Sequence, residues 1–83
     1  MRIKVQYIRT DKFGRFIYEV VGDSQYQVTI RHSEVADAHE CVILKNDKMA
    51  ACKWHPTRKT AKGWAISEVK AMYGNERQKN STA

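Results

Sequence analysis

Polar and apolar residues alternate along the first two thirds of the chain, as they do in strands that bury one face. In the first such segment, Ile3, Val5 and Tyr7 share one side. Turn-forming residues separate the segments, at residues 11–14, 22–24 and 45–48. The predicted strands cover residues 2–9, 15–21, 25–30 and 40–44, with residues 49–54 as a fifth strand of weaker pattern. Residues 32–39 are polar and are predicted to form a loop or a single helical turn.

The periodicity changes after Pro56, which ends the predicted sheet. Thr57 is a good N-cap, and it precedes a helix predicted from Arg58 to about Tyr73. The apolar stripe of this helix consists of Ala61, Ala65, Val69 and Met72, flanked by Ile66 and Tyr73. Gly74 stands where a left-handed C-cap is expected.

Together these elements predict an α+β fold. We expect an antiparallel sheet of four to five strands with one C-terminal helix packed on a face. The length of 83 residues predicts a single domain, covering residues 1–74. The polar residues 75–83 are predicted to form a disordered tail.

Positive charge is concentrated in one part of the sequence. The net charge of the chain is +6, and residues 45–62 hold six cations and a single acid, Asp47. The six are Lys45, Lys48, Lys53, Arg58, Lys59 and Lys62. A localised excess of this kind favours a polyanionic partner, with a merely solvated surface as the alternative interpretation.

The predicted helix begins with three of these cations, Arg58, Lys59 and Lys62. A helix N-terminus already carries partial positive charge, so cations there do not help folding. Together with free backbone N–H groups they form a natural phosphate site. The alternative is that their long stems cover apolar surface and end in solvent. The candidate nucleic-acid-binding residues are Thr57, Arg58, Lys59, Lys62, Lys45, Lys48, Lys53 and Trp54. Trp54 is the aromatic residue expected to be exposed for stacking, whereas most other aromatics are needed in the core.

From His39 onward, the order is a strand, a short turn, a strand, and then Thr-Arg-Lys-x-Ala-Lys-x-x-Ala at a helix start. Residues 39–73 thereby resemble the C-terminal half of double-stranded-RNA-binding domains, whose helix begins Ser-Lys-Lys-x-Ala-Lys. The resemblance implies that the cations bridge phosphates across the RNA major groove. The matching positions are Thr57, Arg58, Lys59, Ala61, Lys62 and Ala65. The chain departs from that family because strands are predicted where the family has an N-terminal helix. The order of three strands and a helix is also similar to AP2-like DNA-binding domains and to the arm-binding DNA domains of integrases.

A second constellation consists of His39, Cys41, Cys52 and His55. If residues 46–47 form the hairpin tip, Cys41 lies directly opposite Cys52. Two thiols and two imidazoles within reach could bind zinc, and the spacing is faintly similar to SWIM-type zinc fingers. Packing of free thiols is the favoured interpretation, with a disulfide as a further alternative. We therefore predict no metal and no cofactor.

Catalytic motifs are weak. The sequence has no Gly-rich phosphate loop and no Gly-x-Ser-x-Gly. Asp37, His39 and Cys41 alternate and could be drawn as a relay, but such a run occurs often by chance. We expect a protein that is not an enzyme.

The sequence also lacks an apolar run of transmembrane length and an apolar signal-peptide core, so a cytoplasmic location without membrane contact is expected. The predicted partner is RNA or DNA, bound through its phosphates with little sequence specificity. The alternative is a protein-interaction module, such as a small phage-type inhibitor or adaptor that docks on an acidic protein surface. An edge strand within residues 2–9 could also mediate a homodimer.

Overall fold

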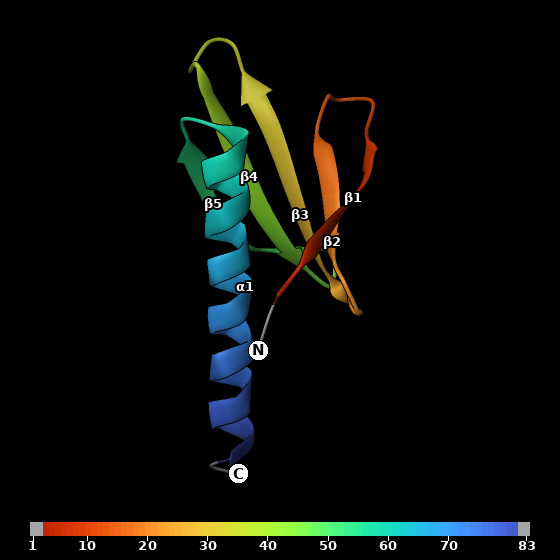
Figure 1. The fold of residues 1–83 in the computed structure, drawn as a ribbon, viewed down its shortest axis with the longest axis vertical. Coiled ribbons are helices and arrows are strands. Elements are labelled where there is room, and N and C mark those ends of the chain that lie inside the picture. Colours follow the sequence, from red (N-terminus) through yellow and green to blue (C-terminus); the bar gives the residue numbers. More distant parts are fainter. Residues whose placement is uncertain (1–2, 82–83) are drawn as a thin grey trace.

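A five-stranded antiparallel sheet and one helix make up the computed structural model of the chain, which describes residues 3–81 and the side chains of residues 3–75 (Figure 1). The elements are β1 (Val5–Thr10), β2 (Phe16–Val20), β3 (Asp23–Ser33), β4 (Ala38–Lys45), β5 (Lys48–His55) and α1 (Arg58–Ser81). The strands lie in the sheet in sequence order, so each pairs with the next through a hairpin. The predicted α+β fold is confirmed.

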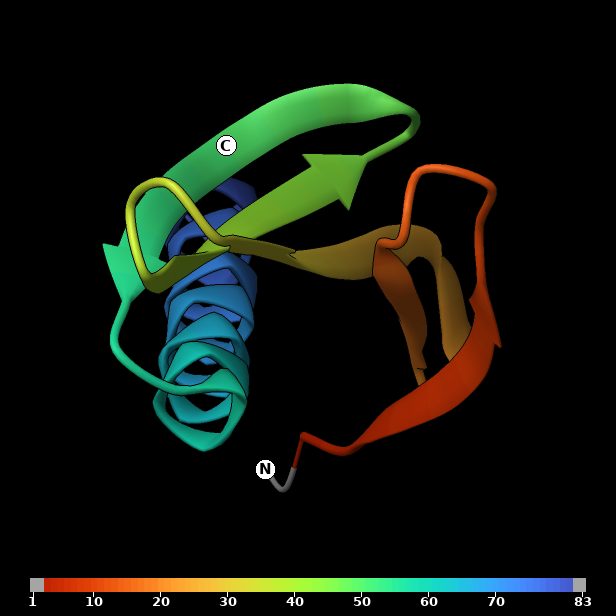
Figure 2. The ribbon, with the colours of Figure 1, turned by 90° about the horizontal axis from the view of Figure 1, so that it is seen from above.

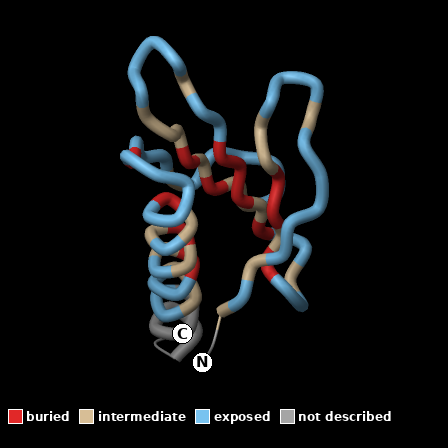
Figure 3. The backbone as a smooth tube through the Cα atoms, turned by 45° about the horizontal axis from the view of Figure 1, so that its top comes forward, coloured by how far each residue is buried: buried red, intermediate tan, exposed pale blue. Residues whose placement is uncertain are grey.

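The helix covers only part of the sheet. It packs on β3, β4 and β5, whereas β1 and β2 curl away from it (Figure 2). Buried residues are concentrated on the central strands and on the side of the helix that faces them (Figure 3). The core consists of Tyr18, Val20, Tyr26, Val28, Ile30, Cys41, Ile43, Ala61, Ala65 and Val69. The helix side of β1 and β2 is therefore left partly open.

The helix begins as the sequence predicts. The backbone N–H of Thr60 donates to Oγ1 of Thr57 at 3.1 Å, and the N–H of Thr57 donates to Oγ1 of Thr60 at 3.3 Å. This reciprocal arrangement satisfies two backbone donors at the helix start. Ala61, Ala65 and Val69 are completely buried, because small side chains let the helix approach the sheet closely.

The predicted end of the helix is wrong. α1 continues through Gly74 to Ser81, and Gly74 is not among the residues with positive φ. The reason is that residues 76–79 (Glu-Arg-Gln-Lys) are all good helix formers, so the polar composition after Gly74 does not stop the helix. The segment predicted as a disordered tail is helical as far as Ser81, and its last two residues lie outside the described part of the chain.

The loop predicted at residues 32–39 is shorter than expected. β3 extends to Ser33 and β4 begins at Ala38, so the turn between them covers only residues 34–37. His32 and His39 are paired across the two strands. The polar residues of this segment lie at the end of a long hairpin, where their side chains can reach solvent while their backbones remain paired. Polarity therefore did not distinguish a loop from an exposed strand end. The first strand is also shorter than predicted, since β1 begins at Val5.

The hairpin of β4 and β5 has a different register from the predicted one. Asn46 and Asp47 form the tip with φ angles of 52° and 66°, as a two-residue type I′ turn requires. Beyond the tip, the register shifts by one residue between Ile43 and Leu44, which leaves Ala50 as the extra residue of a β-bulge. As a result Cys52 pairs with Val42 instead of Cys41.

Candidate functional site

The cations at the start of α1 form one side of an open pocket. Arg58 and Lys59 are exposed and Lys62 is half-buried. Together with Tyr18 of β2 they line a pocket with a volume of about 380 Å³. The helix positions the cations because residues 58 and 62 are one turn apart on the same side.

Two of these cations lie over aromatic rings of β2. The guanidinium carbon of Arg58 is 4.7 Å from the ring centre of Phe16, and Nζ of Lys62 is 5.7 Å from that of Tyr18. Both distances are within the range of cation–π attraction. The stems do cover apolar surface, as the alternative interpretation expected, but the rings also fix where the charges lie.

No carboxylate of the described side chains neutralises this cluster. The ion pairs among the side chains of residues 3–75 include Arg15 with Asp11, Arg31 with Glu40, and His32 with Asp37, and none of these involves Arg58, Lys59 or Lys62. The first turn of α1 contains no acidic residue. Arg58, Lys59 and Lys62 therefore add their charges to the positive end of the helix dipole.

The other basic residues predicted for the site lie elsewhere. Lys45 and Lys48 flank the β4–β5 turn, at the end of β5 opposite to the helix start. A strand of eight residues is roughly 25 Å long, so this turn is a separate feature. Nζ of Lys45 lies 5.5 Å from the ring centre of Tyr26. Lys53 is exposed on the helix side of the edge strand β5, opposite Cys41.

Trp54 is exposed, as predicted, but it is not part of the basic cluster. It is 44% exposed and pairs with Glu40 across β4 and β5. This position is on the face of the sheet away from the helix. The structure thus brings together Arg58, Lys59 and Lys62, which follow the capping residue Thr57, and separates them from Trp54.

Aromatic residues of β1 and β2 adjoin the cluster and were not predicted as site residues. Tyr7 is 51% exposed, and its ring centre lies 5.8 Å from that of Tyr18 and 6.3 Å from that of Phe16. The alternation of apolar and polar residues in β1 and β2 indicates one covered face, but it does not show that the helix packs mainly on β3, β4 and β5. The number of predicted strands was the sequence signal that part of this face stays uncovered, because one helix is too narrow to cover five strands.

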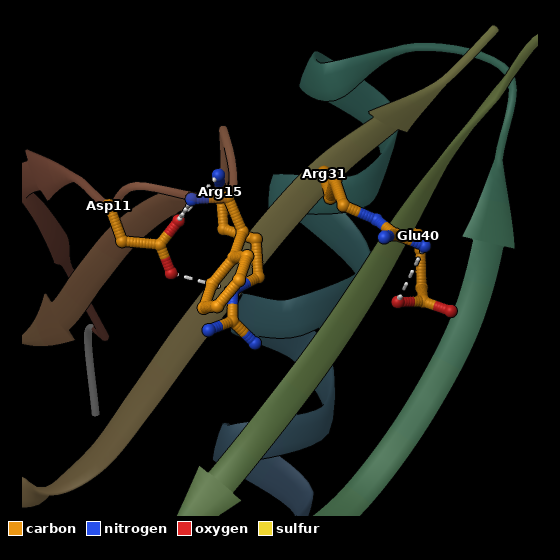
Figure 4. Close-up of polar contacts among 5 residues, drawn as sticks. Asp11, Arg15, Arg31 and Glu40 are labelled. Atoms are coloured by element: carbon orange, nitrogen blue, oxygen red, sulfur yellow. Dashed lines mark hydrogen bonds and ion pairs between the residues drawn. The ribbon is translucent and has the colours of Figure 1, made fainter.

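A second open pocket lies on the opposite face of the sheet (Figure 4). It has a volume of about 310 Å³ and is lined by Phe13, Arg15, Arg31 and Glu40. Nε of Arg15 donates to Oδ2 of Asp11 at 2.7 Å, and Nη2 of Arg31 lies 3.9 Å from Oε1 of Glu40. Each guanidinium therefore has its own carboxylate, and this pocket lacks the positive excess of the helix start.

The alternative metal set of His39, Cys41, Cys52 and His55 is not assembled, because the bulge turns Cys52 to the face opposite Cys41. Cys41 is buried on the helix side, where its thiol donates to the Ala61 carbonyl at 3.6 Å, and Cys52 is exposed. Burial and the proximity of Cys52 raise the pKa of Cys41 to about 12. Among the described side chains of residues 3–75, no three His, Cys, Asp or Glu residues are grouped so that they could hold a metal ion.

The histidines instead pack against one another and against the helix. The rings of His32 and His39 are 4.8 Å apart, and the ring of His55 is 5.3 Å from Trp64. Asp37 lies in the turn between β3 and β4, where its Oδ1 is 3.9 Å from Nε2 of His32. It therefore does not continue the alternating row of His39 and Cys41 on β4 that the relay would require.

No protein-family model, curated protein or solved structure matches this chain. Within the described residues 3–81, the helix α1 is not long and apolar enough to cross a membrane.

Proposed function

We propose that this protein binds nucleic acid through backbone phosphates, using Arg58, Lys59 and Lys62. The observation that carries this proposal is the clustering of three cations around one open pocket with no described carboxylate beside them. Phosphate contacts position a protein on nucleic acid without reading its sequence, so little sequence specificity is expected. We keep the cytoplasm as the proposed location, because reducing compartments preserve free thiols such as Cys41 and Cys52.

The arrangement suits an anionic ligand for a physical reason. Cations near the N-terminal end of a helix are unfavourable for the fold by about 0.3–1 kcal/mol each. Here Arg58 lies over the Phe16 ring and Lys62 over the Tyr18 ring, which offsets part of this cost and holds these two charges at the pocket. A phosphate group entering the pocket would relieve the mutual repulsion of the cations.

The decisive experiment replaces Arg58, Lys59 and Lys62 together by glutamine, which retains polar side chains of moderate length without charge. We expect the triple variant to lose at least tenfold in affinity for DNA and RNA oligonucleotides, measured by fluorescence anisotropy at low salt. Its Tm should stay within a few degrees of the parent value, because the lost cation–π contacts and the relieved repulsion act in opposite directions.

The matched control replaces three exposed lysines outside the cluster, Lys4, Lys12 and Lys70, by glutamine. This variant loses the same net charge and should retain most of the affinity. Equal losses in the two variants would contradict a localised site, and unchanged affinity in the first would contradict the proposal itself.

A second candidate function, a protein-interaction module, is favoured by the edge strand β1. Its outer edge is unpaired in the sheet, and it exposes Tyr7 and Ile8, which is 42% exposed. Such an edge can pair with a strand of a partner protein or of a second copy. Capture of one stoichiometric protein that survives nuclease treatment, and is lost on Ile8→Lys, would favour this function.

A further inference from the structure

The structure points to single-stranded nucleic acid as the ligand, with an unpaired base stacked on Tyr7 while its phosphates lie on Arg58 and Lys62. This inference rests on the proposed function and deepens it. It concerns the surface formed by Tyr7, Phe16, Tyr18, Arg58, Lys59 and Lys62, which we term the basic–aromatic surface.

The first argument is the open aromatic wall. The helix packs on β3, β4 and β5 (Figure 2), and β1 and β2 curl away from it. The rings of β1 and β2 on the same side of the sheet are therefore not all covered. Tyr18 is buried and Phe16 half-buried, but Tyr7 is 51% exposed. An exposed aromatic ring offers a π-face, to which any base can stack.

The second argument is that the Tyr7 ring is held in place before a ligand arrives. Its ring packs edge-on against Tyr18 at 5.8 Å, with an interplanar angle of 72°. Its hydroxyl hydrogen-bonds to Oγ1 of Thr10 at 2.7 Å. A ring with so little remaining freedom loses little entropy on binding, which favours affinity.

The third argument is continuity between the charges and the rings. Tyr18 lines the basic pocket, lies 5.7 Å from Nζ of Lys62, and also contacts Tyr7. A chain whose phosphates meet the cations is therefore directed over Tyr18 towards Tyr7. Cations beside stacking rings are the combination found in single-strand binding sites.

A duplex cannot use both halves of this surface. Its bases are stacked on one another and present only their edges, so Tyr7 would have no base face to contact. The cations would still meet duplex phosphates. The basic–aromatic surface therefore predicts discrimination between strands, and the cations alone do not.

The experiment measures fluorescence anisotropy with four probes that have the same number of nucleotides per strand. The probes are a single-stranded oligothymidine, an oligouridine, a DNA duplex, and an abasic strand that retains the phosphates and lacks the bases. We expect at least tenfold weaker binding to the duplex and to the abasic strand than to the two single strands. The Tyr7→Leu variant keeps apolar volume on β1 and removes the π-face, and it should lose about tenfold for single strands only.

Two controls separate stacking from folding. Tyr7→Phe removes the hydroxyl and keeps the ring, and it should restore most of the single-strand affinity. Phe13→Leu removes an aromatic residue that is 64% exposed and lines the pocket on the other face, and it should change nothing. Thermal unfolding of each variant shows whether β1 remains folded.

The outcomes distinguish this inference from the proposed function. If all four probes bind equally and Tyr7→Leu is unchanged, stacking is refuted and phosphate binding stands. If no probe binds at low salt, both are refuted. If the Tyr7→Leu loss also appears with the abasic strand, Tyr7 supports the fold of the site and the stacking role is refuted.

Discussion

At the scale of single residues, His55 has the most unusual environment near the helix start. It is only 9% exposed, stacks beside Trp64, and its Nε2 is buried without a hydrogen-bond partner among the described residues. Burial, and next the positive charge of Lys53, lower the pKa of His55 below its usual value. The folded protein therefore favours the neutral imidazole, since a protonated one would bury a charge and an unpaired donor.

The pH dependence of stability follows from this direction. An unfolded chain binds a proton at His55 more readily than the folded one, so the unfolding free energy rises with pH in that window. Stability should be fully present above about pH 6.5, the usual histidine value, and decline as pH falls towards the folded pKa. Urea unfolding at pH 7.5 and 5.5 measures the decline.

The His55→Gln variant should show a smaller difference between the two pH values than the parent. His32→Gln, at an exposed position, serves as the control and should keep the parent difference. Equal pH dependence in His55→Gln and the parent would assign the effect to other groups.

The limits of sequence reasoning are also visible at this scale. The pattern correctly identified Trp54 as exposed and Arg58, Lys59 and Lys62 as a cluster. It placed Tyr7 on the apolar side of its strand and did not predict its exposure, because alternation reports which side a residue faces, and not whether another element covers that side. The exposure of Tyr7 depends on where the helix crosses the sheet, which is a property of tertiary packing.

At the scale of elements, α1 shows how composition can outweigh a helix-stop signal. Gly74 was predicted to cap the helix in the left-handed region, and in the structure it lies inside the helix. A Cβ built at Gly74 or at Gly63 meets no atom within 4 Å. Both glycines therefore carry only the entropic cost of glycine in a helix.

The sign of the stability change on replacement of Gly74 by alanine tests whether Gly74 is helical. We expect stabilisation of about 0.5–1 kcal/mol, or a Tm increase of about 2–8 °C for a domain of this size. Gly63→Ala is the matched helical control and should give a similar increase. A left-handed Gly74 would give the opposite sign, because alanine is strained at positive φ.

The hairpin of β4 and β5 shows a different limit. Asn46 and Asp47 predict the turn from sequence, because few residue types adopt positive φ at two successive positions. The bulge at Ala50 has no such signature, since alanine fits a regular strand equally well. A register derived from the turn alone is therefore correct next to it, at Leu44 and Met49, and wrong by one residue beyond the bulge.

At the scale of the whole molecule, charge is distributed unevenly over the two faces of the sheet. The helix side carries the cluster of Arg58, Lys59 and Lys62 without a described carboxylate. On the other face, Arg15 and Arg31 are each paired with an acid (Figure 4). The fold class could be predicted from periodicity, and so could the basic cluster. The orientation of the cluster towards β2 could not, because it depends on the contacts with Phe16 and Tyr18.

Salt dependence gives a quantitative test at this scale. Each phosphate neutralised on a single strand contributes about −0.7 to the slope of log K against log salt concentration. Three cations therefore predict a slope of about −2, measured by anisotropy between 50 and 300 mM NaCl. Lys59→Gln should reduce its magnitude by about 0.7, whereas Lys70→Gln should leave it unchanged. A slope near zero for the parent would exclude phosphate contacts as the main source of affinity.

The one-residue irregularity at Ala50 has a practical consequence for all of these measurements. It leaves Cys41 shielded beneath the helix and presents Cys52 to solvent on the face remote from the cations. A maleimide dye would consequently attach at a single defined position without any cysteine being mutated. A fluorophore on Cys52 would therefore lie on the face of the sheet away from the proposed ligand site, where it does not obstruct binding.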